Sequence, residues 1–204
     1  MNSTSSSLLE RVKSRDQAAW ERLVSLYSPL VYHWCRQAGL QAADAADVGQ
    51  EVFQAVARKV ADFRHDRPGD SFRRWLRTIT RNKLRDRAKR DQVGEVGAGG
   101  SDAQNALLQV PADDAEQVSA EQDNHEAALV YRQAVDLVRA EFQGHTWESF
   151  WRVTVEDHRP EDVARDLGVT VNVVYLAKSR VLRRLRDEFA GLVEDVLLGE
   201  PPAP

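Results

Sequence analysis

The chain has 204 residues, with 28 Lys or Arg against 32 Asp or Glu, so its formal net charge is −4. Its apolar share of 42% is ordinary for a globular protein, and no apolar run reaches the roughly 18–20 residues that span a bilayer. The N-terminus lacks the pattern of a signal peptide, and a single cysteine, Cys35, excludes an internal disulfide and a thiolate zinc site. We therefore expect a cytoplasmic protein without a membrane span.

A first long helix is predicted between Asp16, a suitable N-cap, and Gly39, a suitable end point. Pro29 lies inside it and lacks a backbone N–H, which predicts a kink or a short break. The apolar residues that recur at three- and four-residue spacing are Trp20, Leu23, Val24, Tyr27, Val31 and Trp34.

A second helix is predicted over about residues 44–62, with a valine every fourth residue on its buried side. Its other side carries polar residues that either face solvent or dock onto a partner helix rich in Arg and Asn; the pattern leaves both interpretations open. Gly49 costs roughly 1 kcal/mol of helix stability relative to Ala and hints at the close approach of another helix. The valines are Val48, Val52, Val56 and Val60, and the polar row is Asp44, Asp47, Gln50, Glu51 and Gln54.

A third helix is predicted over about residues 71–90, with Ser71 as its cap and Phe72, Leu76, Ile79 and Leu84 buried. Arginines spaced three and four residues apart form a basic ridge suited to a phosphate backbone. Trp75 is either a core residue or a platform on which unpaired bases stack. The ridge is Arg74, Arg77, Arg81 and Arg85, with Asn82 and Lys83 beside it.

The net charge conceals three blocks of opposite sign. Residues 64–90 hold eleven basic and three acidic residues, a net of +8. Residues 91–126 hold nine acidic and no basic residues, and residues 172–186 hold five basic and no acidic residues. The acidic block is poor in large apolar residues and predicts a flexible linker, whereas the two basic blocks indicate either solvated helix faces or surfaces that bind a polyanion.

The C-terminal part begins with an amphipathic helix that carries Ala128, Tyr131, Val135, Val138 and Phe142 and ends at Gly144; a shorter helix follows from Thr146. After it, the run PEDVARDLGVTVNVVYLAKSRVLRRLR, residues 160–186, has the spacing of a helix-turn-helix.

In that run, Pro160 suits the first turn of one helix, Gly168 the turn, and Thr170 the cap of the next helix. The second helix should bury Val174, Ala177, Val181 and Leu185. A purely structural helical hairpin is the alternative. In a DNA-binding motif, base edges would be met by the outer residues near the start of the helix, and phosphates by its basic residues. The outer residues are Thr170, Asn172, Val173, Tyr175, Leu176 and Ser179, and the basic ones are Lys178, Arg180, Arg183 and Arg184.

These patterns predict an all-α fold of two small helical domains. The predicted boundaries are residues 8–90, a linker over 91–124, residues 125–190 with the helix-turn-helix, and a tail over 191–204. The five histidines are scattered and no glycine-rich phosphate loop follows a strand, so we expect no enzyme, no metal and no cofactor.

Two motifs resemble those of the extracytoplasmic-function (ECF) sigma factors of bacterial RNA polymerase. Residues 47–53, DVGQEVF, resemble the family's D-x-x-Q-E-x-F signature, and residues 72–82, FRRWLRTITRN, resemble its F-x-x-W-L-x-x-I-x-R-N run. A linker and a C-terminal helix-turn-helix follow in the family's order, so the resemblance covers about residues 8–190.

The resemblance implies a promoter-specificity subunit whose partners are core RNA polymerase and promoter DNA, with an anti-sigma factor as a further expected partner. It implies docking on the clamp helices of the largest polymerase subunit through Asp47, Gln50, Glu51, Phe53 and Gln54. The third helix would recognise and open the −10 element, the 64–71 loop would hold a flipped base, and the C-terminal helix would read the −35 element. The linker would pass near the RNA exit path.

The sequence also departs from the family. Trp147 and Trp151 stand where many members have a segment with Pro and Arg, and residues 174–176, VYL, replace the usual small-basic-Ser pattern. The family's −35 base preference therefore does not carry over. A stand-alone helix-turn-helix regulator and an adaptor that binds only protein are the rival functions.

Overall fold

The computed structural model describes residues 7–64, 71–94 and 119–193, and these residues are helical without any strand. The predicted all-α class is confirmed. The helices, in chain order, are α1 (Leu8–Lys13), α2 (Gln17–Gln37), α3 (Ala42–Lys59), the short 3-10 helix η1 (Val60–Asp62), α4 (Phe72–Gly94), α6 (Ala120–Arg139), α7 (His145–Thr154), α8 (Pro160–Leu167) and α9 (Val171–Phe189).

Helix α2 begins and ends where the sequence predicts. The Asp16 side chain accepts a hydrogen bond from the backbone N–H of Ala19, and Gly39 follows the helix with a φ of +87°, a conformation that glycine adopts without strain. The helix continues through Pro29, so of the two predicted outcomes, a kink or a short break, the break does not occur.

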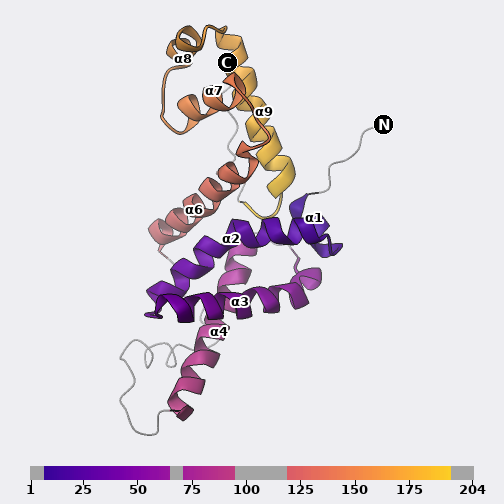
Figure 1. Cartoon of the computed structure of the whole chain (residues 1–204), viewed down its shortest axis with the longest axis vertical. Coiled ribbons are helices and arrows are strands. Elements are labelled where there is room, and N and C mark those ends of the chain that lie inside the picture. The colour runs from indigo at the N-terminus through magenta and orange to yellow at the C-terminus, as the bar shows by residue number, and fades with distance from the viewer. Residues whose placement is uncertain (1–6, 65–70, 95–118, 194–204) are drawn as a thin grey trace.

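Helices α3 and α4 pack on α2 with the buried faces that their patterns predict (Figure 1). The four valines of α3 and η1 are buried, as are Phe72, Leu76, Ile79 and Leu84 of α4. Ser71 caps α4 by accepting from the backbone N–H of Arg74 at 3.2 Å. The C-terminal half of α4 extends beyond α2 and α3 (Figure 1).

The predicted N-terminal and C-terminal units share one apolar core in this structure. Helix α6 lies along α2, and the end of α9 reaches α1 (Figure 1). Leu23 and Tyr27 of α2 belong to the same buried cluster as Val138 of α6 and Phe189 of α9. The hydroxyl of Tyr27 donates to the backbone carbonyl of Leu192, which ties the segment after α9 to α2.

The segment predicted as a linker is helical at both ends. Helix α4 continues to Gly94 and α6 already begins at Ala120, capped by Ser119. The remaining residues, 95–118, lie outside the described part, as do the 65–70 loop and the tail beyond 193. Within the described residues, no helix is long and apolar enough to cross a membrane.

Candidate functional site

The polar row of α3 is divided between two faces of the helix. Asp47, Gln50 and Gln54 are exposed, whereas the carboxylate of Glu51 points to α4 and forms ion pairs with Arg90 at 3.0 Å and Lys83 at 3.7 Å. These two pairs hold α3 against α4. Asp47, Gln50 and Gln54 are therefore the part of the row that a partner can reach.

A second acidic residue of the row also faces α4. The Asp44 carboxylate accepts from the Arg87 guanidinium at 2.6 Å, and this hydrogen bond raises the pKa of Arg87 above its ordinary value. Like Glu51, Asp44 therefore contributes to the α3–α4 contact and is less available to a partner than Asp47.

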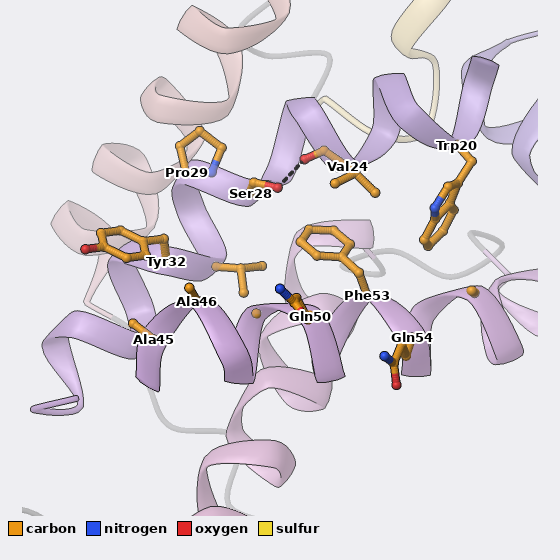
Figure 2. Close-up of a pocket in the computed structure, with 13 residues that line it drawn as sticks. Trp20, Val24, Ser28, Pro29, Tyr32, Ala45, Ala46, Gln50, Phe53 and Gln54 are labelled. Carbon is orange, nitrogen blue, oxygen red and sulfur yellow. Dashed lines mark hydrogen bonds between the residues drawn. The ribbon is translucent and has the colours of Figure 1, made fainter. Parts of the chain in front are cut away.

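An apolar groove of about 770 Å³ runs between α2 and α3 (Figure 2). Phe53 points from α3 towards α2, with Trp20 near one end of the groove and Tyr32 near the other. Trp20 and Phe53 meet edge to face, with ring centroids 6.4 Å apart. The exposed Gln50 and Gln54 also line the groove, so it is continuous with the reachable part of the polar row.

Gly49 lies among the residues that line this groove, and a Cβ added to it would meet no atom within 4 Å. The close approach that the sequence suggested at this glycine is therefore not made by any helix in the described part of the chain. The position opens instead onto the groove between α2 and α3.

The basic ridge of α4 is partly covered by α6. Arg77 is largely buried, donates to the carboxylate of Glu126, and stacks 5.3 Å from the Trp34 ring. Arg73, only 4% exposed, donates to the Asp123 carboxylate at 3.0 Å and lies 3.9 Å from Glu126. Sequence reasoning did not identify this cluster, because the ridge and the two acidic residues lie about 50 positions apart in the chain.

The other ridge residues differ in exposure. Arg74 and Asn82 are exposed, whereas Arg81, Lys83 and Arg85 are partly buried. Arg74 lies between Arg73 and Arg77, whereas the other four residues lie further along α4, beyond the turn that Arg73 and Arg77 hold against α6.

Trp75 belongs to an aromatic cluster and also reaches the surface. Its ring lies 5.1 Å from that of Phe63 and 5.2 Å from that of Phe72, between ring centroids. It lines a pocket of about 380 Å³ together with Asp62, Arg74 and others, next to the end of the described segment at Arg64. The structure thus combines the two interpretations of this tryptophan, a packed ring and an accessible edge.

The C-terminal motif has its predicted local geometry. Gly168 adopts φ +66° after α8, which an L side chain rarely adopts, and the Thr170 hydroxyl caps α9 by accepting from the backbone N–H of Val173. Val174, Ala177, Val181 and Leu185 are buried. At the outer surface, Asn172, Val173, Tyr175, Leu176, Arg180 and Arg183 are exposed, and Lys178 and Ser179 are partly buried.

Arg184 is engaged within the protein rather than presented to a ligand. Its guanidinium donates at 2.6 Å to Glu141, in the turn that follows α6, and at 2.8 Å to Glu188. Glu188 also pairs with Arg22 of α2 at 3.0 Å. These contacts connect α9 to the turn after α6 and to α2, a role that the basic pattern of α9 alone did not indicate.

Comparison with known proteins identifies relatives of this chain. Residues 23–93, from α2 through nearly all of α4, match the sigma-70 region 2 family. The chain is 31% identical over 106 residues to RNA polymerase sigma factor NccH of Alcaligenes xylosoxydans xylosoxydans, and 35% identical over 79 residues to RNA polymerase sigma factor CnrH of Cupriavidus metallidurans. It is 29% identical over 180 residues to ECF RNA polymerase sigma factor SigE of Mycolicibacterium smegmatis.

The matched regions are 52%, 39% and 86% of this chain, respectively. They are 55%, 40% and 64% of the relatives, so the chain spans about half the length of the curated relatives that it matches. The match to SigE is the longest of the three and covers most of this chain.

Proposed function

We propose that the chain is an ECF sigma factor, which binds core RNA polymerase and directs transcription initiation at specific promoters; the matches to sigma-70 region 2 and to ECF sigma factors support this. The observation that carries the proposal is the match of residues 23–93, because it includes both the reachable polar row of α3 and the basic helix α4. The role is one of binding and positioning, without a catalytic step of its own.

Core polymerase binds through the exposed side of α3 and the adjoining groove. Asp47, Gln50 and Gln54 supply polar contacts, and Phe53 supplies an apolar one at the groove. Glu51 acts by holding α3 on α4 through Lys83 and Arg90, which keeps the docking side in place. The partner surface is the clamp helices of the largest polymerase subunit, as the family resemblance implies.

The −10 element binds along α4. Arg74, Arg81, Lys83 and Arg85 contact phosphates, Asn82 reads a base edge, and Trp75 receives an unpaired base at its accessible edge. Arg77 joins this surface only after its ion pair with Glu126 opens. Contact between Arg77 and DNA therefore requires this ion pair to open, and the phosphate backbone then replaces the carboxylate as the partner of Arg77.

The −35 element binds at α9 in duplex form. The N-terminal turns of α9 face the major groove, with Lys178, Arg180 and Arg183 on phosphates. Arg184 stays in its contacts with Glu141 and Glu188 and takes no part.

Run-off transcription with purified core polymerase tests this function. The diagnostic variant is Asp47→Arg, because Asp47 is exposed, whereas reversing the charge of Glu51 would also break the α3–α4 ion pairs. We expect promoter-specific transcripts with the wild type and their loss with Asp47→Arg. The matched control is Asp136→Arg, an equal charge reversal at an exposed position of α6, which should keep transcription.

Two results would contradict the proposal. One is tight, specific duplex binding by the chain alone with no effect on purified polymerase, which would favour a stand-alone regulator. The other is polymerase binding that Asp47→Arg and Asp136→Arg weaken equally, which would remove the docking assignment to α3.

A further inference from the structure

The first two turns of α9 expose large apolar side chains. Val173, Tyr175 and Leu176 are 42%, 49% and 48% exposed. In the described part of the chain, the other large apolar residues exposed to this degree are Tyr32 and Val155, which lie on different elements. Three of these five residues thus gather within four positions at the start of one helix.

These side chains are not required by the packing of α9. The helix packs through Val174, Ala177 and Val181, all buried, and its N-terminus is already capped by Thr170. The three exposed residues occupy the remaining directions around the helix, where a solvated surface would ordinarily be polar. Their placement therefore indicates a ligand outside the chain.

The chemistry of this surface favours duplex DNA as the ligand. No Lys or Arg occurs over residues 171–177, whereas Lys178, Arg180 and Arg183 follow directly along the helix. An apolar patch at the start of the helix, followed by basic residues, matches a base edge flanked by phosphates. This is how a recognition helix meets the major groove.

The absence of Lys and Arg over residues 171–177 also restricts which bases the start of α9 can read. Arg or Lys on guanine is the commonest specific contact, and no such residue lies in these first turns. Asn pairs well with adenine, and apolar side chains contact the methyl group of thymine. Asn172 and Val173 are adjacent, and Leu176 lies one helical turn beyond Val173, so the two kinds of contact fall side by side.

We propose that the start of α9 reads A·T base pairs in the −35 element, with Val173 and Leu176 packed on thymine methyl groups and Asn172 on adenine. The inference rests on the proposed function and deepens it, since it names the bases that this surface selects. Tyr175 adds apolar contact at the edge of the same patch.

The test uses the holoenzyme of this chain with core polymerase. Promoter fragments are selected by the holoenzyme from a pool randomised over the −35 region, and we expect A·T pairs at the positions under α9. Each selected thymine is then replaced by uracil, which removes only the methyl group. Affinity should fall about fourfold for each contacted methyl, from the transfer free energy of one such group, while uracil in the spacer should change nothing.

Two variants assign the effect to the apolar patch. Leu176→Ala and Val173→Ala should each lower the wild-type preference for thymine over uracil towards onefold at one position. Val155→Ala, which shortens an equally exposed apolar residue outside α9, should retain the full preference. Circular dichroism and urea unfolding of each variant verify that the fold is unchanged.

The possible failures are distinguishable. Selected elements with G·C pairs under α9, or equal affinity for thymine and uracil, would overturn the base assignment even if promoter-specific transcription persists. Weaker polymerase binding by Leu176→Ala, with an unchanged thymine preference of the holoenzyme that still forms, would make the patch a protein contact and would also overturn the base assignment. If no fragment supports specific transcription, the proposed function fails, and the inference fails with it.

Discussion

The Arg77 guanidinium of α4 donates to the carboxylate of Glu126, an acidic side chain of α6 with no exposed surface. Arg73, itself 4% exposed, lies 3.9 Å from the same carboxylate. Two arginines of a helix proposed to bind DNA are thus engaged by a helix from the other half of the chain. The contact joins the first turns of α4 to the first turns of α6.

Removing Glu126 should destabilise the protein strongly. Glu126→Ala leaves the largely buried Arg77 without its carboxylate, and such a loss costs about 3 kcal/mol or more in the free energy of unfolding. Urea unfolding followed by circular dichroism measures it. Glu121→Ala, at an exposed acidic residue of the same helix, should change stability by less than about 0.5 kcal/mol. Equal effects from the two variants would show that the buried ion pair contributes little.

The local structure of this protein follows closely from its sequence. Asp16, Ser71 and Thr170 cap the helices that they were predicted to cap, and Gly168 makes the turn before α9. The valine stripe of α3 is buried as predicted. Each of these predictions depends on residues within one or two helical turns of one another, where sequence spacing and spatial distance are nearly the same.

The contacts between distant elements could not be predicted in the same way. Glu126 is one of nine acidic residues in the block over residues 91–126, yet it is buried, because two arginines of α4 compensate its charge. The polar row of α3 likewise appears as one face, but Glu51 turns to Arg90 and Lys83. Which opposite charges meet depends on how helices pack, and helical periodicity does not contain that information.

The buried thiol of Cys35 should make stability fall at alkaline pH. Burial raises the pKa of Cys35 from its ordinary value of 9.0 to about 11. Since the unfolded chain then loses the proton at lower pH than the folded one, this stabilising effect is complete below pH 9 and is lost as the pH rises towards 11. The free energy of unfolding, measured by urea at several pH values, should fall more steeply for the wild type than for Cys35→Ala. Parallel pH profiles would contradict the prediction.

The cap of α9 should contribute measurably to stability. Thr170→Ala removes the hydroxyl that accepts from the backbone N–H of Val173, and the loss of such a cap costs about 1 kcal/mol. Thermal unfolding should register a lower midpoint. Thr78→Ala, at an exposed threonine within α4, is the comparison; its hydroxyl bonds to the Arg74 carbonyl inside the helix and caps nothing, so the midpoint should change little. A larger decrease in the unfolding midpoint for Thr78→Ala than for Thr170→Ala would contradict a stabilising role for the Thr170 cap.

Replacing Gly49 by Ala should stabilise the protein but weaken its binding to core polymerase. Gly49→Ala replaces a glycine in the interior of α3, where Ala is favoured by about 0.5–1 kcal/mol, and the added Cβ meets no atom of the chain within 4 Å. The free energy of unfolding should therefore rise. If a polymerase helix lies over the groove, as we propose, the same methyl group should weaken core binding, measured by titration of labelled protein. The control is Ala57→Gly, at an exposed position of α3 that also lines the groove. It should lower stability through the same difference in helix propensity between Ala and Gly, but it adds no atoms to the groove. A stabilised Gly49→Ala variant with unchanged affinity would mean that the partner does not approach α3 at this glycine.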